Sequence, residues 1–230
     1  MGKRILDVVG GLLLCVAAIP FILVGVVVSM VSLRTRSPFF FQSRIGEGGK
    51  ELRFPKVRTL PQWMPAYGLK TNMRFDKAPK ATRWLRKLHI DELPQLFLVV
   101  KGELSLVGPR PKMPDAVEPV EAHYGTTRVR VPQGCTGLWQ ISVHKVDLPC
   151  AHPEYDLFYV ANSSVRLDLW ILTRTVLNGL RITKLVTLAD VPRWAVRSEG
   201  TPVLHLLESD IPADAPSRPA MLSLVEDARG

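Results

Sequence analysis

Cysteine is scarce in this 230-residue chain, and its three cysteines match no metal-binding pattern. Cys15 lies in an apolar segment, and Cys135 and Cys150 stand apart without histidine partners at zinc-ligand spacing. A structural zinc site is therefore not expected, and sparse cysteine is typical of a reducing, cytoplasmic environment.

The common sequence motifs for nucleotide and zinc chemistry are also missing. The chain has no Gly-x-x-x-x-Gly-Lys loop, no Gly-x-Gly-x-x-Gly, no His-Glu-x-x-His and no internal repeat. These absences argue against P-loop enzymes, dinucleotide-binding folds and the usual zinc proteases. Any phosphate chemistry must therefore use carboxylates, basic side chains and a bound metal ion.

Negative charge is in deficit. The chain has 30 Lys and Arg against 21 Asp and Glu, which gives a net charge of +9 and a pI near 9.7. This balance indicates an acidic partner, which is nucleic acid, anionic lipid or a phosphorylated small molecule. Because the basic residues are dispersed and no recognition motif is present, we expect no nucleic-acid partner.

The segment from residue 5 to 33 carries a single charge, that of Asp7. It is longer than the ~20 apolar residues that a helix needs to cross a bilayer. Basic residues flank it on both sides, and the positive-inside rule therefore favours a cytoplasmic location for both flanks. These basic residues are Lys3, Arg4, Arg34, Arg36 and Arg44.

Pro20 stands near the middle of this segment, where it removes a helix hydrogen bond and crowds the preceding turn. A helix broken at Pro20, which enters and leaves the membrane on one side, reconciles the proline with the two basic flanks. An ordinary transmembrane helix with a tolerated proline is the main alternative. A signal peptide is the third interpretation, but the apolar segment has no convincing small-x-small cleavage site followed by the polar sequence with which a mature protein begins.

Two short extended runs, 39–46 and 52–59, surround a glycine-containing turn and predict a β-hairpin. Lys56 and Arg58 are two residues apart, so in a strand they lie on the same face and are placed to meet one phosphate together. A solvated basic edge strand explains the same spacing.

Helical patterns follow the hairpin. Residues 61–80 read as a loop, 81–88 as a short basic helix, and 165–186 as an amphipathic helix rich in basic residues and tryptophan. Each helix suits either the core or the membrane surface, and the composition of 165–186 favours the surface. Residues from about 198 onward are rich in Pro, Ala, Asp and Ser and predict a weakly ordered tail.

The pair Asp91-Glu92 precedes an apolar stretch that predicts a helix of two to three turns, with Pro94 in its first turn and Gly102 as its stop. The two carboxylates then lie at the positive end of the helix dipole. Just outside the first turn, the backbone is free to aim both at one point. An ordinary N-cap pair is the alternative.

Arg110 stands between Pro109 and Pro111, which restrict its backbone to an extended conformation. A guanidinium presented in this way has little conformational entropy left to lose and suits bidentate phosphate or carboxylate recognition. A plain rigid turn explains the tripeptide equally well. Residues 128–140 add a strand-like run into a glycine-bounded turn.

In combination, these motifs resemble the bacterial sugar transferases, the monotopic polyprenyl-phosphate phosphoglycosyl transferases. The resemblance runs in order from about residue 3 to 180, and many collinear motifs make it far more specific than any one of them. The motifs are Lys3 to Asp7, Phe41 to Gly46, Lys56 to Thr59, Leu85 to Lys87, Asp91 to Gln95, Lys101 to Pro111, Thr136 to Gln140 and Asp156 to Thr175.

This resemblance implies transfer of a sugar-1-phosphate from a UDP-sugar to undecaprenyl phosphate, with release of UMP. It implies that Asp91 is the nucleophile and forms a phosphosugar-aspartyl intermediate, and that Asp91 and Glu92 hold Mg²⁺. The implied phosphate contacts are Lys56, Arg58 and Arg86, Arg110 is assigned to the nucleotide, and Gln140 and Tyr159 complete the expected substrate-binding residues.

The sequence departs from the family pattern in two places. Pro132-Gln133-Gly134 has one residue more than the usual Pro-Gly, which reshapes the turn, and residues 76–82 lack the common Asp-x-Arg-x-Thr spacing. A membrane-anchored basic binding module, or an inactive transferase homologue, is therefore kept as the alternative function. It predicts salt-sensitive membrane binding that does not depend on Asp91 or Glu92.

The expected fold class is α-rich α+β, with a re-entrant membrane helix broken at Pro20, a short β-hairpin and interfacial amphipathic helices. The expected divisions are a membrane-embedded segment at 1–36, one cytoplasmic catalytic domain at 37–197 and the tail at 198–230. We expect the protein at the bacterial inner membrane facing the cytoplasm, in contact with membrane lipid, with a homodimer as one possible assembly.

Overall fold

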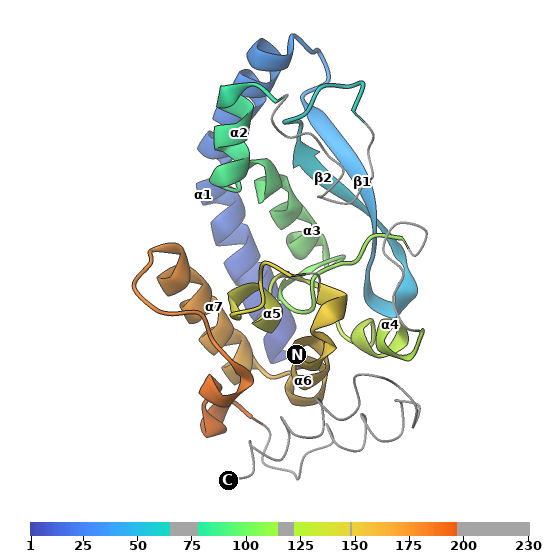
Figure 1. Ribbon diagram of the computed structural model, residues 1–230, viewed down its shortest axis with the longest axis vertical. Coiled ribbons are helices and arrows are strands. Elements are labelled where there is room, and N and C mark those ends of the chain that lie inside the picture. Colours follow the sequence, from blue (N-terminus) through green and yellow to red (C-terminus); the bar gives the residue numbers. More distant parts are fainter. Residues whose placement is uncertain (65–77, 115–121, 148, 197–230) are drawn as a thin grey trace.

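The computed structural model describes residues 1–64, 78–114, 122–147 and 149–196. These form an α-rich α+β structure with two small two-stranded sheets (Figure 1). The α-helices are α1 (Gly2–Leu33), α2 (Lys80–Lys87), α3 (Leu96–Lys101), α4 (Ala122–Arg128), α5 (Leu138–Ile141), α6 (Pro153–Asn162) and α7 (Val165–Gly179). The strands are β1 (Phe39–Ile45), β2 (Glu51–Val57), β3 (Ser105–Val107) and β4 (Gly134–Thr136).

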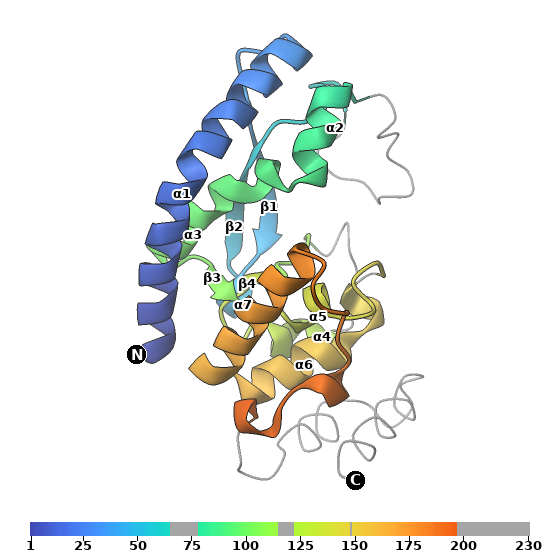
Figure 2. The same ribbon diagram turned by 90° about the vertical axis from the view of Figure 1, so that its left-hand side faces the viewer.

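Helix α1 lies along one side of the molecule and packs on it with a narrow stripe of mostly small side chains (Figure 2). A Cβ atom on Gly11 would lie only 3.0 Å from Val99 Cγ1 of α3, so the two helices approach closely there. The stripe recurs every three or four residues, as a helix face does. Its members are Asp7, Gly11, Cys15, Ala18, Ile22, Gly25 and Ser29.

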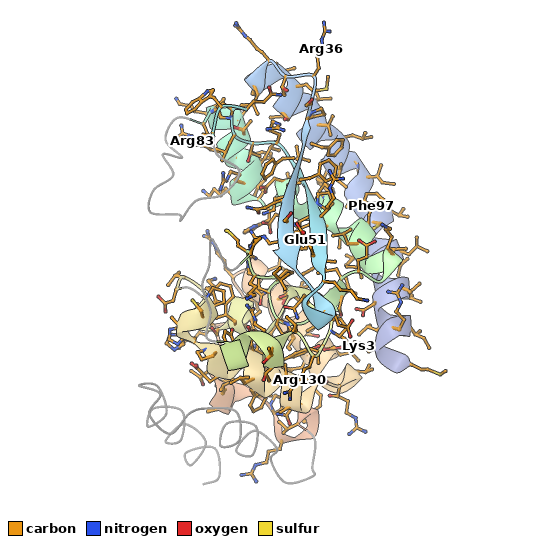
Figure 3. All side chains as sticks on the ribbon, turned by 90° about the vertical axis from the view of Figure 1, so that its right-hand side faces the viewer. Lys3, Arg36, Glu51, Arg83, Phe97 and Arg130 are labelled. Carbon is orange, nitrogen blue, oxygen red and sulfur yellow. The ribbon has the colours of Figure 1, made fainter. Side chains whose placement is uncertain are left out.

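The opposite face of α1 is apolar and exposed. Leu13, Val16 and Val31 are 67%, 61% and 72% exposed, and only 22% of the most apolar 18-residue window is buried. By length and composition α1 is able to cross a membrane. In Figure 3 the side chains of this face project outward from α1 along the right-hand edge of the molecule. So large an unpacked apolar surface is typical of a membrane- or protein-interaction face.

The prediction that Pro20 breaks this segment is wrong at the level of secondary structure. The α-helix is continuous from Gly2 to Leu33, and Figure 2 shows it curving along its length rather than turning back. Pro20 lies on the exposed face, where its ring meets no packed side chain. The helix bends gently and so accommodates the proline and the hydrogen bond that it cannot donate.

Polar contacts fasten the first turns of α1 to the rest of the chain. Lys3 and Arg4, which the sequence suggested as a basic flank and as part of a family motif, donate to specific acceptors, and Asp7 accepts two hydrogen bonds. Figure 3 shows Lys3 at the lower end of α1. The contacts are Lys3 to Asp168 (2.8 Å) and the Val107 carbonyl (2.9 Å), Arg4 to the Val99 and Val100 carbonyls (both 2.8 Å), and the Ser105 hydroxyl (2.9 Å) and Leu106 N–H (2.8 Å) to Asp7.

The predicted hairpin is confirmed. Strands β1 and β2 pair antiparallel from Phe39 opposite Val57 to Ile45 opposite Glu51. The turn contains Gly48 and Gly49, both with positive φ, a conformation that glycine adopts without strain. The hairpin carries Lys56 to the edge of the site described below.

A second, parallel sheet lies in the core and was not predicted at residues 105–107. Ser105 of β3 pairs with Gly134 of β4, and Val107 pairs with Thr136. A Cβ atom on Gly134 would lie 2.1 Å from the Gly108 backbone nitrogen, so glycine is required there. Strands of three residues give too little alternation to be recognised from sequence.

Two helices match their predicted positions, with one boundary corrected. The basic helix expected at 81–88 is α2, and the amphipathic helix expected to run to residue 186 ends as α7 at Gly179. Helix α7 buries Leu167 and Ile171 in the core, so the membrane-surface interpretation applies only to its exposed face. Most of the predicted loop and the predicted tail lie outside the described residues.

Candidate active site

The acidic pair lies inside a short 3-10 helix, η3 (Ile90–Gln95), which leads directly into α3. The predicted single helix starting near Leu93 is therefore corrected: a 3-10 segment comes first, and α3 begins at Leu96. The predicted stop is confirmed, because Gly102 caps α3 with φ 88°. Successive 3-10 residues point about 120° apart, so the two side chains leave the helix in different directions, but their carboxylates are close enough for the Glu92 charge to raise the pKa of Asp91.

Glu92 contacts two cations from distant parts of the chain. Its Oε1 lies 2.8 Å from Lys56 Nζ of β2 and 3.8 Å from Arg110 Nη2. Burial alone would raise the pKa of Glu92, but the charges of Lys56 and Arg110 outweigh it and hold the pKa at about 2. Glu92 is therefore a fixed negative charge at neutral pH.

Asp91 has a different environment. Its side chain is only 8% exposed, and it makes no side-chain hydrogen bond or ion pair to the part of the chain that the structure describes. Burial, and then the neighbouring Glu92 carboxylate, raise the pKa of Asp91, while Lys56 and Arg86 act against the shift. A buried carboxylate without its own cation is well placed to react or to bind a metal ion.

The groups around Glu92 line a narrow crevice between the hairpin, η3 and the start of β4. Its volume is about 10 Å³, enough for roughly one water molecule. Three basic side chains from separate segments meet here, which makes the crevice suited to an anion. Its lining is Arg44, Phe54, Lys56, Glu92, Gln95, Arg110, Pro111, Gly134 and Cys135.

Arg44 is a site residue that the sequence reasoning counted only as a membrane flank. It is buried in β1, and its guanidinium donates to the Pro111 carbonyl (3.3 Å) and to Gln42 Oε1 (2.8 Å). The signal available in sequence was its place within the Phe41 to Gly46 motif. Arg44 thus ties the hairpin to the proline-bounded turn that carries Arg110.

The backbone of Arg110 is also held from behind. Arg128 is almost completely buried, donates from Nη2 to the Arg110 carbonyl at 2.7 Å, and pairs with Asp156 at 2.8 Å. Tyr124 donates to the same Asp156 carboxylate at 2.7 Å. This network adds tertiary restraint to the rigidity that the two prolines predicted for Arg110.

The structure does not bring Arg58 to the crevice. Its guanidinium donates to the Ser37 and Phe39 carbonyls at 3.0 and 3.2 Å. It lines a separate hollow of about 510 Å³ beyond the end of α1, together with Arg34 and Arg36. Lys56 and Arg58 therefore have different partners and do not converge on one point.

Tyr159 and Gln140 also lie away from the crevice lining. The Tyr159 hydroxyl is buried and donates to Asp168 at 2.7 Å, within the network that anchors Lys3. Both amide atoms of Gln140 are buried without a hydrogen-bond partner among the described residues. Arg86 of α2, by contrast, is close enough to oppose the raised pKa of Asp91.

Comparison with known proteins gives a consistent result. The family model described as bacterial sugar transferase matches residues 1–181. An uncharacterized sugar transferase, EpsL, of Bacillus subtilis is 38% identical over 178 residues, which cover 76% of this chain and 85% of that protein.

Two further relatives are named for their reactions, and each is 33% identical over a stretch covering 76% of this chain. One is the UDP-N-acetylgalactosamine-undecaprenyl-phosphate N-acetylgalactosaminephosphotransferase of Aeromonas hydrophila, of which the match covers 42%. The other is the UDP-glucose:undecaprenyl-phosphate glucose-1-phosphate transferase of Caulobacter vibrioides, of which it covers 68%. The chain thus spans less than half the length of some relatives and most of others.

Proposed function

This chain belongs to the bacterial sugar transferase family, and from that premise we propose that it transfers a sugar-1-phosphate from a UDP-sugar to undecaprenyl phosphate and releases UMP. Relatives named for this type of reaction align with it over three quarters of its length. The reaction is the first membrane step in assembling a surface glycan or glycoconjugate.

The observation that carries the proposal is the pair of buried Asp91 and half-buried Glu92 beside Lys56 and Arg110. A UDP-sugar brings a diphosphate, and the crevice offers cations from three separate segments. Glu92 holds Lys56 and Arg110 in place until the diphosphate arrives. When the substrate binds, its phosphates take over part of the contact that Glu92 makes with Lys56 and Arg110. The two cations are therefore already oriented before the substrate arrives.

Asp91 acts as the nucleophile. Its carboxylate oxygen attacks the phosphorus that bears the sugar, the phosphorus–oxygen bond of the diphosphate breaks, and UMP departs with the bonding electron pair. A phosphosugar-aspartyl intermediate remains. An oxygen of undecaprenyl phosphate then attacks the same phosphorus, which forms the polyprenyl-diphosphate-sugar and frees the Asp91 carboxylate.

The residues fit a Mg²⁺ ion at this position. Asp91 and Glu92 are adjacent carboxylates with hard oxygen donors, and Asp91 is buried without a cation partner of its own among the described residues. Mg²⁺ held there would neutralise the diphosphate and the charge on the departing phosphate. The side chains of Lys56 and Arg110 orient the phosphates on the other flank.

Membrane attachment in this proposal keeps both ends of α1 on the cytoplasmic side of the inner membrane, with the continuous helix lying in one leaflet. Lys3 binds Asp168 and Val107, and the other end of α1 leads into the hairpin, so both ends are fastened to the same polar body. A straight crossing of a helix about 48 Å long would pull these contacts apart. The apolar outer face supports insertion into one leaflet.

Replacement of Asp91 tests the chemistry. Purified protein in detergent, given Mg²⁺, undecaprenyl phosphate and a panel of UDP-sugars, should release UMP with at least one of them. Asp91→Asn should lose at least 10³-fold in rate, because the amide is not a nucleophile. The matched control Asp190→Asn, at an exposed position, should keep wild-type activity.

The outcome separates the two functions. Without acceptor, wild-type protein should release one equivalent of UMP and gain the mass of a phosphosugar. Full activity in Asp91→Asn would overturn the covalent mechanism. Absence of UMP release with every sugar, together with salt-sensitive membrane binding that Asp91→Asn leaves unchanged, would favour the binding-module alternative.

Topology is tested with tags in intact cells. An epitope placed before Lys3 and another next to Arg44 should both be reached only after the inner membrane is permeabilised, because both ends of α1 lie on the cytoplasmic side. A periplasmic epitope with known accessibility is the control. Access to the first epitope alone from the periplasm would establish a transmembrane α1 and refute the one-leaflet arrangement.

A further inference from the structure

A second group of potential ligands lies in the loop between α5 and α6, outside the candidate active site. One ligand atom each from His144, Asp147 and His152 lies within 4.8 Å of the others. We propose that these three side chains form a binding site for a divalent transition metal ion of the zinc type.

The distances already suit coordination. Asp147 Oδ2 lies 3.4 Å from His144 Nδ1 and 3.0 Å from His152 Nε2. Tetrahedral ligands at 2.0–2.1 Å from an ion are about 3.3 Å apart, so an ion among these atoms needs only small side-chain adjustments. The two imidazole rings stack with centroids 3.7 Å apart and an interplanar angle of 23°, so the side chains already lie together, and a rotation of the rings points both nitrogens at one ion.

Glu154 supplies the outer contact that metal-binding histidines commonly have. Its Oε1 lies 3.2 Å from His152 Nδ1. With a metal ion bound, a proton on Nδ1 donated to this carboxylate would leave the Nε2 lone pair, 3.0 Å from Asp147 Oδ2, for the ion. One ring nitrogen is thus used for orientation and the other is available for a metal.

The ligand types select the metal. Two imidazoles and one carboxylate suit Zn²⁺ and its neighbours, whereas Mg²⁺ prefers oxygen ligands alone. The side chains of His144, Asp147 and His152 are 38%, 46% and 22% exposed, so an ion and a water ligand have access from solvent. The sequence argued against zinc because it lacks Cys-x-x-Cys spacing, but a site built from histidine and aspartate needs no cysteine.

A metal ion here would join the two ends of the loop. Asp156 lies two residues beyond Glu154 and holds Arg128, which in turn supports Arg110. The ion therefore has a structural role: it shortens the free loop before α6 and steadies the helix from which that support comes.

The test uses the full chain in detergent, purified with a tag that contains no histidine and treated with EDTA. Co²⁺ is titrated by its visible absorption, and Zn²⁺ affinity is measured by competition with a chromogenic chelator. We expect one equivalent per chain and at least tenfold weaker binding in His144→Ala and His152→Ala, with a tenfold loss in Glu154→Gln. His205→Ala, outside the described residues, is the matched control.

Three further results bear on the site. Asp91→Asn should bind Zn²⁺ as wild type does, which separates this site from the proposed Mg²⁺ position. Cys150→Ser should also bind normally, and a Co²⁺–thiolate absorption band would overturn the ligand set. Two outcomes would refute the proposal: wild-type affinity in the double variant of His144 and His152, or no stoichiometric binding of Co²⁺ or Zn²⁺ at all. In either case the three side chains would form only hydrogen bonds or ion pairs with one another.

Discussion

Among single residues, Lys3 has a role that its charge alone did not indicate. Its ammonium pairs with Asp168, whose side chain is fully buried and also accepts from Tyr159. The pKa of Asp168 is raised, because burial outweighs the opposing effect of Lys3. Burial of the Asp168 carboxylate therefore costs free energy, and the ion pair with Lys3 offsets part of that cost.

Replacing Lys3 by Met should destabilise the protein by about 3 kcal/mol at pH 7.5, because Asp168 stays buried without its cation. The folded-state pKa of Asp168 then rises further above its unfolded value. A raised pKa gives stability that is present at low pH and lost as pH increases through it, so the deficit should shrink between pH 7.5 and 5. Denaturation in detergent at both pH values measures it.

Lys101→Met is the matched control. Lys101 pairs with Glu103, but the two side chains are 64% and 40% exposed, so its loss should cost little at either pH. A Lys3→Met deficit that does not change with pH would show that Asp168 keeps its charge without Lys3.

Residue-level prediction depends on how local the chemistry is in sequence. Asp91, Glu92, Lys56 and Arg110 were selected from short motifs, and their roles stay predictions. The structure places Lys56 and Arg110 each against Glu92. Arg44 and Arg128 were missed because their importance lies in contacts made 67 and 18 positions away. No local spacing reveals such contacts. For the same reason, the sequence did not indicate that Tyr159, expected to bind substrate, bonds with Lys3 and Asp168.

Among the elements, α1 has two faces with opposite packing demands. Ala17 lies on the exposed face, and Ala18 is 5% exposed on the packed stripe. The close approach of Gly11 to Val99 shows how little space the stripe leaves. Small residues on one face therefore matter as much as apolar residues on the other.

Adding bulk to each face separates their roles. Ala18→Leu should destabilise the protein by about 1–3 kcal/mol, because the larger side chain forces α1 away from its neighbours. Ala17→Leu, the same change one residue earlier, should be neutral and should bind liposomes at least as well. Thermal unfolding in detergent compares the two, and equal loss of stability in both would refute the packed-stripe description.

Element prediction followed the strength of local patterns. The hairpin was predicted by its strands and glycines, and α2 by its basic apolar periodicity, and both are confirmed. The break at Pro20 was wrong because a proline on an exposed helix face is accommodated by curvature. The 3-10 start at Ile90 was missed because an acidic pair followed by Pro94 is equally typical of the first turn of an α-helix.

For the whole molecule, α1 is part of the folded body and not a detachable anchor. It contacts η3, α2, α3, α7 and strands of both sheets. Removing residues 1–33 would expose the partners of the packed stripe and leave Asp168 and the Leu106 N–H without Lys3 and Asp7.

A chain of residues 34–230 should therefore lack a cooperative thermal transition and elute as aggregates, rather than behave as a soluble enzyme. Circular dichroism and size-exclusion chromatography in the same detergent provide the measurement. Removal of residues 198–230, predicted from composition to be a weakly ordered tail, is the control and should preserve the transition. A monomeric, cooperatively unfolding 34–230 fragment would contradict this account.

The polar anchors at the start of α1 also set an order of events during synthesis. Lys3, Arg4 and Asp7 bond to groups 95 to 165 positions later in the chain. When α1 leaves the ribosome, none of those partners has been made, and its packed face has nothing to pack on. In the proposed membrane arrangement, lipid shelters the helix during that interval. The completed body then binds the helix, so in this arrangement membrane insertion precedes folding, and the last contact forms only when Asp168 has emerged.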